Sequence, residues 1–478
     1  MLFSSTVFLF AFLPLVLLCY FASGKKYRNL VLLVFSLLFY AWGEPVYVVL
    51  MILSCGVNFI LGKLVYRYKW EENYQSEKKT KAVIICTLCF NLGLLGFFKY
   101  IDFFIENLNH ILPVSISPLH LALPIGISFY TFQSMSYVFD VYRKDAKLQK
   151  NFLDLMMYVS LFPQLIAGPI VRYQTVANEI NERHESLDEA GEGISLFIIG
   201  LGKKVLFANT IGELFTQLGN LDASQQSVGL MWLSAIAYGL QIYFDFSGYS
   251  DMAMGLGKIF GFHFLKNFNY PYISTSITEF WRRWHISLGT WFRDYVYIPL
   301  GGSRCSKLKM YRNIMVVWML TGFWHGASWN FVLWGFSFGV ILLIEKTFLL
   351  KWLEKLPKVV GHIYTLLLVL LSWVIFAYDK IEVGISHIVS MFGFGKLPVW
   401  NEATSYYLVS YGLLFAILIF ASTPVPKAIH LHLKRKLKGK VHTVYELVVS
   451  PVFVLIVLLL STAYLVSNSF NPFLYFRF

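Results

Sequence analysis

Residues 313–344 read NIMVVWMLTGFWHGASWNFVLWGFSFGVILLI. The stretch contains no Asp, Glu, Lys or Arg, and its one ionisable side chain is the imidazole of His325, between Trp324 and Gly326. It is longer than the ~20 apolar residues that cross a bilayer, which predicts membrane-embedded helix. An ionisable residue at membrane depth is costly and marks a functional site by default. His325 is therefore the first candidate functional residue.

The composition extends this prediction to the whole chain. Of its 478 residues, 57% are hydrophobic and 14% are charged, whereas a soluble domain is about 25% charged. We expect an all-α polytopic membrane protein with about a dozen crossings and re-entrant or interfacial helices between them. The first segment lacks a basic start and a cleavage site, so we expect a retained helix. The candidate spans are residues 2–21, 30–42, 46–66, 82–98, 119–142, 152–170, 194–215, 228–262, 314–344, 362–378, 406–422 and 447–466.

The net charge of +13 resides mainly in short loops between the apolar segments. Cytoplasmic loops of membrane proteins carry such an excess of Lys and Arg, so we expect these loops in the cytoplasm and both termini outside. A nucleic-acid-binding face, with basic and aromatic residues interleaved, is missing from the sequence. We expect one integral-membrane domain over residues 1–478, with N-terminal helices in 1–150, a central part in 151–350 and C-terminal helices in 351–478. Residues 178–193, the most polar segment, predict a surface helix or loop.

Residues 271–312 differ from the rest of the chain, because they are rich in Trp and Arg and too charged to span a bilayer. A helical pattern begins near Glu279, which can pair with Arg282 or Arg283 at the three- and four-residue spacings. Two interpretations remain open from these residues alone. The segment is either an anchor at the membrane interface or the wall of a polar cavity inside the protein.

His285 lies within this segment, four residues after Trp281, a spacing that predicts one shared helix face. By itself, such a histidine is either a hydrogen-bonded structural residue or a catalyst. Asp245 and Asp251 form a second polar group in an apolar span, and a buried carboxylate needs a partner. We expect a structural hydrogen-bond network there. Asp294 can pair with its neighbour Arg293, and no spacing in the chain predicts a metal site.

Several stretches together resemble the membrane-bound O-acyltransferase superfamily, in its bacterial alginate O-acetyltransferase branch. They follow one another in order over nearly the whole chain: MLFSSTVFLFAFLPL at 1–15, FFKYIDFF at 97–104, LPIGISFYTFQSMSYVFDVYR at 123–143, FPQLIAGPIVRY at 162–173, QIYFDFSGYSDMAMG at 241–255, EFWRRWHISLGTWFRDYVYIPLGGSR at 279–304, TGFWHGASWNFVLWG at 321–335 and NSFNPFLYFRF at 468–478.

The resemblance implies many helices around a tunnel that crosses the plasma (inner) membrane. An acyl thioester donor, commonly acetyl-CoA, would arrive from the cytoplasm as a substrate, with no bound cofactor. An acceptor hydroxyl would arrive from outside. The essential histidine of the superfamily falls on His325, and its second common polar position falls on His285. Expected partners are an exported acetyltransferase of the SGNH type, with a Ser-His-Asp site, a polysaccharide acceptor and membrane lipid.

On this basis we expect His325 to act as general base, because a neutral imidazole can take the proton of an attacking hydroxyl. An acyl-histidine intermediate is the other route. Trp324, Asn330, Trp281, Arg282 and Asp294 are candidates for lining the tunnel or stabilising the transition state.

Two other classes of function remain. In the first, the protein transfers D-alanyl or other acyl groups to a teichoic-acid or peptidoglycan system. A transporter or scaffold of a polysaccharide export machine would line its path with polar residues and do no chemistry. Many transporters show two related halves, and this sequence shows none, which favours the enzyme.

Overall fold

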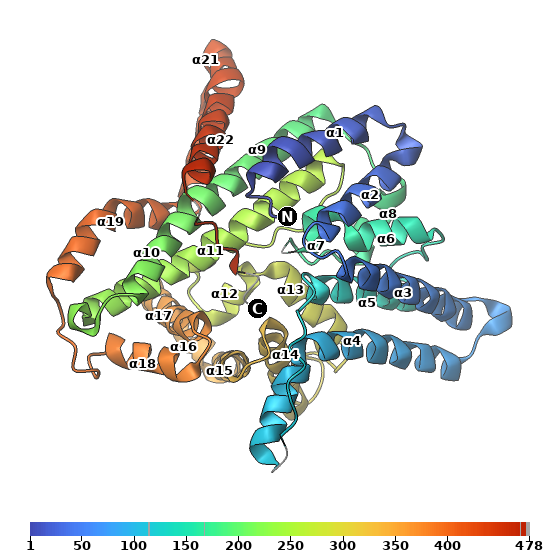
Figure 1. Ribbon diagram of the computed structural model, residues 1–478, viewed down its shortest axis with the longest axis horizontal. Coiled ribbons are helices and arrows are strands. Elements are labelled where there is room, and N and C mark those ends of the chain that lie inside the picture. Colours follow the sequence, from blue (N-terminus) through green and yellow to red (C-terminus); the bar gives the residue numbers. More distant parts are fainter. Residues whose placement is uncertain (113–114, 167, 469, 475–478) are drawn as a thin grey trace. The chain divides into compact units, whose positions relative to one another are not determined.

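Long apolar segments fold as helices because a helix satisfies its own backbone hydrogen bonds in lipid. The computed structural model describes residues 1–112, 115–166, 168–468 and 470–474, and within these ranges the regular structure is helical throughout (Figure 1). The chain divides into two units: residues 1–197 with 252–265, and residues 198–251 with 266–478. The all-α prediction is confirmed.

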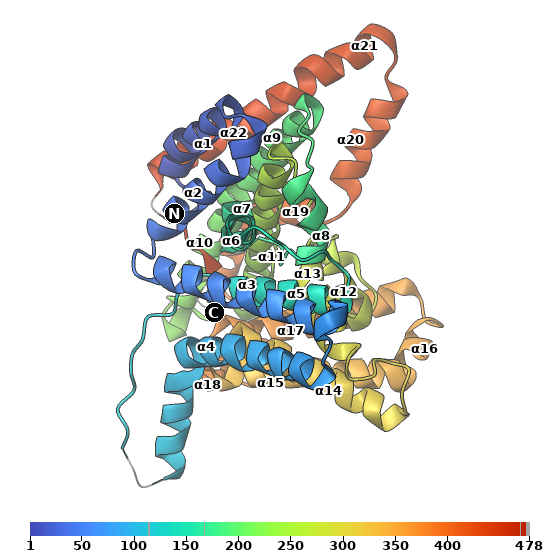
Figure 2. The same cartoon turned by 90° about the vertical axis from the view of Figure 1, so that its right-hand side faces the viewer.

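Unit 1 holds the N-terminal helices. In Figures 1 and 2, α3, α4 and α5 lie side by side, in agreement with their contacts. The helices of this unit are η1 (Phe8–Phe12), α1 (Leu13–Ala22), η2 (Lys25–Tyr27), α2 (Arg28–Ala41), α3 (Tyr47–Trp70), η3 (Glu72–Tyr74), α4 (Glu77–Ile111), α5 (Ile127–Arg143), α6 (Phe152–Ser160), α7 (Phe162–Leu165), α8 (Tyr173–Asn181) and most of α9 (Leu187–Gly202).

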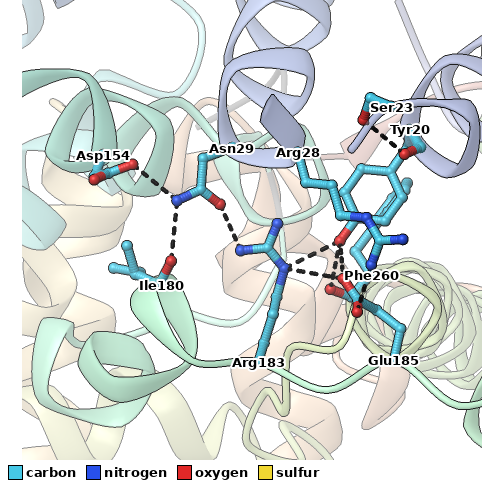
Figure 3. Close-up of polar contacts among 9 residues, drawn as sticks. All are labelled: Tyr20, Ser23, Arg28, Asn29, Asp154, Ile180, Arg183, Glu185 and Phe260. Carbon is cyan, nitrogen blue, oxygen red and sulfur yellow. Dashed lines mark hydrogen bonds and ion pairs between the residues drawn. The ribbon is translucent and has the colours of Figure 1, made fainter. Parts of the chain in front are cut away.

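A buried polar network ties α1 and α2 to the loop after α8 (Figure 3). The carboxylate of Glu185 accepts from the Tyr20 hydroxyl and pairs with Arg28 at 2.6 Å, while Arg183 Nε donates to Tyr20 Oη at 3.0 Å. Burial opposes ionisation, but the hydrogen bonds from Tyr20 and Arg28 outweigh it and lower the pKa of Glu185. The side chains of Arg183 and Glu185 are only 7% and 10% exposed. The polar segment 178–193 lies largely at the surface, as expected, but complementary charges make the burial of its Arg183 and Glu185 side chains tolerable.

Unit 2 holds the remaining helices. Its core is rich in aromatic side chains, including Trp284, Trp334 and Trp373. The helices are η4 (Lys203–Asn209), α10 (Thr210–Gly219), η5 (Ala223–Gln225), most of α11 (Val228–Ile259), η6 (Pro271–Ile273), α12 (Ile277–Arg283), α13 (Ile286–Phe292), η7 (Arg293–Tyr297), α14 (Lys307–His325), α15 (Trp329–Ile344), η8 (Glu345–Leu349), α16 (Leu350–Leu353), α17 (Lys358–Ala377), α18 (Ile381–Met391), α19 (Glu402–Ala421), α20 (Val425–Lys436), α21 (Gly439–Val444), η9 (Tyr445–Val449) and α22 (Ser450–Ser467).

Seven helical stretches of the described chain are long and apolar enough to cross a membrane. This identifies an integral membrane protein with several crossings. The expected dozen also counted segments that the structure divides or shortens: 152–170 contains the short helices α6 and α7, and 314–344 contains parts of α14 and α15. The candidate spans are Tyr47–Trp70, Glu77–Ile111, Leu187–Gly219, Trp329–Leu353, Lys358–Ala377, Glu402–Ala421 and Gly439–Ser467.

Glycines decide how α14 and α15 meet. A Cβ on Gly322 would overlap the carbonyl oxygen of Phe331, and a Cβ on Gly335 would overlap that of Trp318. The two backbones therefore approach so closely that only glycine fits at these positions, as at small-residue helix crossings in membranes. The close crossing holds the turn between the two helices, where His325 lies.

Candidate active site

His325 is the last residue of α14, just before the chain turns into α15. Its side chain is 8% exposed. Three aromatic rings surround the imidazole nearly edge to face, with centroid separations of 5.1 Å to Trp324, 5.1 Å to Trp334 and 5.3 Å to Phe376. These rings fix the plane of the imidazole and keep bulk water from it. The imidazole of His325 is thus shielded and held in one orientation.

The residue after His325 sets the turn. Gly326 has an extended backbone, with φ −169° and ψ 157°. A Cβ at this position would overlap the ring of Phe331, which belongs to the first turn of α15. Only glycine at position 326 therefore allows the chain to turn from α14 into α15 directly after His325.

His285 lies between α12 and α13 and is 3% exposed. Its φ of 46° places it in the left-handed region, which is uncommon for a residue with a Cβ and marks a position held by its surroundings. Burial lowers the pKa of His285 to about 3, so this imidazole is neutral. The prediction of a helix face shared by Trp281 and His285 is wrong, because α12 ends at Arg283 and the chain turns.

Capping interactions fix the starts of the two helices that flank this turn. On the α13 side, the Asn267 carboxamide oxygen accepts from the backbone N–H of Ser287 at 3.0 Å and from its hydroxyl at 2.9 Å. On the α12 side, the Glu345 carboxylate accepts from the N–H groups of Ile277 and Thr278, both at 2.7 Å, and from the Thr278 hydroxyl at 2.6 Å. Glu345 is 1% exposed, and a carboxylate at a helix N-terminus is favourably placed.

The two histidines share one aromatic neighbour. The ring of Trp324 lies 6.1 Å from that of His285 and 5.1 Å from that of His325. Trp281 lies on the His325 side of this aromatic group, with its ring 5.5 Å from that of Trp334, which in turn contacts His325. The structure thus places both histidines next to one indole ring, in a buried aromatic site.

Three other predicted residues have different surroundings. Asn330 Nδ2 donates to the carbonyl oxygen of Tyr378 at 2.8 Å, which joins the start of α15 to the end of α17. Arg282 is exposed. Asp294 pairs with Arg293 at 2.7 Å, the local pairing that the sequence already allowed. Glu279 selects Arg283 as its partner, at 2.8 Å.

The polar group on α11 has two partners that sequence reasoning missed. Lys204 pairs with Asp245 at 2.6 Å, with both side chains 1% exposed, and Lys203 pairs with Asp251 at 2.6 Å. The expected structural network is present, but its cations come from η4. In the sequence, the only sign of these ion pairs is two adjacent lysines inside an apolar stretch, because a buried carboxylate requires a compensating cation.

Among the described residues, no group of three or more His, Cys, Asp or Glu side chains is arranged to hold a metal ion.

Comparisons with known proteins identify the family of the chain. A family model for the membrane-bound O-acyltransferase family matches residues 69–388. The chain is 39% identical to a probable alginate O-acetylase from Azotobacter vinelandii, over the whole of both chains. It is 42% identical to a probable alginate O-acetylase from Pseudomonas aeruginosa, over 88% of this chain and 81% of that protein. It is 35% identical to a peptidoglycan O-acetyltransferase from Helicobacter pylori, over 82% of this chain and 80% of that protein.

The family model matches more than half of the chain, and a relative matches over the whole of both chains. The chain belongs to the membrane-bound O-acyltransferase family and is an integral-membrane O-acyltransferase.

Proposed function

We propose that this enzyme takes an acetyl group from a cytoplasmic acetyl thioester, acetyl-CoA, for O-acetylation of a polysaccharide outside the cell, with His325 as general base. The observation that carries the proposal is the placement of two buried histidines against one indole ring, in a site walled by aromatic side chains. In this account the basic loops lie in the cytoplasm, the protein resides in the plasma (inner) membrane, and an exported partner of the SGNH type completes the transfer.

The proposed reaction transfers the acetyl group from the thioester sulfur to a hydroxyl oxygen. The acceptor hydroxyl attacks the thioester carbonyl while its proton moves to His325. The C–S bond then breaks, and the leaving thiolate takes a proton from the imidazolium, which returns His325 to its neutral form. General base catalysis of this kind contributes roughly 10²–10⁴ in rate. The neutral imidazole of His285 can donate a hydrogen bond to the tetrahedral oxyanion, the interaction that stabilises such intermediates.

A cluster of cations in unit 2 supports a phosphate-bearing donor. Lys266 Nζ donates to Asn269 Oδ1 at 2.9 Å, and Arg283 Nη1 donates to the carbonyl oxygen of the same residue at 3.1 Å. Partial burial lowers the pKa of Lys266, and the nearby charges of Lys427, Lys203 and Arg283 lower it further, while that of Asp251 opposes them. Lys203 and Arg283 already pair with Asp251 and Glu279, so Lys266 is the cation of this group that favours a bound anion, and Lys binds phosphate oxygens strongly.

The names of the relatives support the acceptor class. Alginate O-acetylases match over most or all of the chain at 39–42% identity, and the peptidoglycan enzyme also transfers acetyl to a sugar polymer. Teichoic acid D-alanyltransferases match only about half of the chain, and the one from Bacillus subtilis is 30% identical. This ordering favours acetyl over D-alanyl as the transferred group.

The proposal is tested with purified protein in proteoliposomes that receive radiolabelled acetyl-CoA on one face. We expect slow hydrolysis without an acceptor and transfer of label to added polysaccharide, or to the exported partner, when one is present. A transporter or scaffold would leave acetyl-CoA intact, and that outcome would refute the proposal. Rapid quenching without an acceptor separates the two routes, because only an acyl-histidine intermediate leaves label on the protein.

A further inference from the structure

A strongly basic segment lies between the last two candidate spans and continues into the start of the last one. Residues 425–444, VPKAIHLHLKRKLKGKVHTV, contain six Lys or Arg and no Asp or Glu. They form α20, a short turn and α21, which Figure 2 shows as consecutive helices. The candidate spans Glu402–Ala421 and Gly439–Ser467 flank α20. Because both neighbours are suited to cross a membrane, α20 lies at a membrane surface.

An apolar stripe runs along α20. Val425, Ile429 and Leu433 follow one another at four-residue spacing, which places them on one helix face, and they are 43%, 48% and 38% exposed. None of the twelve residues of α20 is buried. The protein itself therefore leaves this stripe uncovered.

Contacts with η9 orient the helix. His430 Nδ1 and the Tyr445 hydroxyl are 2.7 Å apart, and Lys434 pairs with Glu446 at 2.9 Å. These contacts use a face of α20 that differs from the apolar stripe, since His430 and Lys434 lie about 100° around the helix from Ile429 and Leu433. They hold the stripe outward, and they leave a group of basic side chains exposed beside it: Arg435, Lys436, Lys438 and Lys440.

We propose that α20 is a docking surface for anionic lipid headgroups. The apolar stripe enters the boundary between headgroups and acyl chains, and the four exposed basic residues bind the phosphates of anionic lipids such as phosphatidylglycerol. A basic amphipathic helix binds membranes in this way. Each Lys or Arg near an anionic surface strengthens such binding roughly fivefold. The basic character of α20 thus selects a lipid class, beyond any effect on which side of the membrane the loop occupies.

The test measures backbone hydrogen–deuterium exchange of the full chain in lipid nanodiscs. One set of discs contains phosphatidylcholine alone, and the other contains added phosphatidylglycerol. We expect the amides of α20 to exchange about tenfold more slowly in the anionic discs, given the contribution of several basic residues. High salt should remove most of the difference, because it screens exposed charges.

The deciding variant replaces the four exposed basic residues with glutamine: Arg435→Gln, Lys436→Gln, Lys438→Gln and Lys440→Gln. It spares Lys434, which pairs with Glu446, and Lys427, which lies near the cation cluster of Lys266. The matched control replaces four exposed lysines of η2 and of the first turn of α4: Lys25→Gln, Lys26→Gln, Lys78→Gln and Lys79→Gln. Loss of the lipid-dependent protection in the first variant alone supports the proposal. Equal exchange of wild-type α20 in the two kinds of disc, or persistent protection in the first variant, would overturn it.

Discussion

His285 combines a left-handed backbone with an imidazole shielded from water, and each property limits what can replace it. Asparagine tolerates this backbone region better than other residues with a Cβ, and its neutral amide can still donate a hydrogen bond. Burial lowers the pKa of His285 to about 3, so this group does not titrate between about pH 5 and pH 8.

We therefore predict that His285→Asn folds normally and loses about tenfold in transfer activity, because the shorter amide displaces the donor; complete loss of an oxyanion donor costs about 10²–10³-fold. The pH–rate profile of the remaining activity should parallel that of the wild type, because the proton that sets the profile belongs to another group. Rates of acetyl transfer across the pH range check this. A profile whose inflection disappears in the variant would assign the titrating group to His285 instead.

At the scale of single elements, α12 depends on one buried carboxylate. Glu345 binds two backbone N–H groups and a hydroxyl at the start of the helix that leads to His285. Glu345→Gln turns one of these acceptors into a donor that faces a donor, which costs about 1–3 kcal/mol. We predict a lower melting temperature and a fall in kcat with little change in KM for the donor.

Detergent melting curves and steady-state kinetics measure these effects. Glu77→Gln is the control, since Glu77 pairs with Lys81 on an exposed helix turn, where such a pair contributes little to stability. If Glu345→Gln changed KM alone and left kcat intact, Glu345 would not act through the position of His285.

The C-terminal segment is a second element that rests on a buried pair. Asp245 Oδ2 accepts from the N–H of Leu474, and Lys204 donates to the carbonyl oxygen of Pro472. We predict that Lys204→Met destabilises the protein by about 3–5 kcal/mol, because it leaves the Asp245 carboxylate buried without its cation. Adding Asp245→Asn should restore part of the loss. Thermal unfolding in detergent measures the stability of both variants. The control is Lys203→Met, because the Lys203 side chain is more exposed. Equal losses of stability in the two lysine variants would contradict this account.

The elements also show what sequence reasoning can reach. The helix near Glu279 and its ion pair with Arg283 follow from spacing within one helix turn, so they were predictable. The capping of α12 by Glu345 and the partners of Asp245 and Asp251 were not, because these contacts join helices far apart in the chain. The hydrophobic pattern also could not divide 314–344, since one glycine and one serine between two apolar helices barely change the composition. His325 and His285 were predicted as candidates, but their shared contact with Trp324 required the structure.

At the scale of whole units, unit 1 contains a contact that responds to pH. His263 lies between Glu179 and Glu189, with nitrogen–oxygen distances of 2.8 Å and 3.1 Å. The hydrogen bond with Glu179 raises the pKa of His263 above its ordinary 6.5, with burial opposing and Glu189 adding to the rise. Lys258 and Glu192 pair with each other nearby at the end of α11.

Because the pKa of His263 is higher in the folded protein than in the unfolded chain, protonated His263 stabilises the fold. This contribution to folding stability is complete below about pH 6.5 and is lost as the pH rises through the folded-state pKa. We predict that His263→Ala lowers the melting temperature at mildly acidic pH and has little effect at clearly alkaline pH. Melting curves over this range, with His110→Ala as an exposed control, test the sign. A larger effect at alkaline pH would contradict it.

The central claim for the whole molecule is that His325 takes the proton during acetyl transfer. The most direct measurement compares transfer of radiolabelled acetyl by wild type, His325→Ala and His110→Ala in proteoliposomes, with insertion and size-exclusion profiles matched. We predict that His325→Ala loses at least about 10²-fold in rate, as expected for removal of a general base, while His110→Ala retains full activity. Normal turnover by a properly folded His325→Ala enzyme would contradict the account.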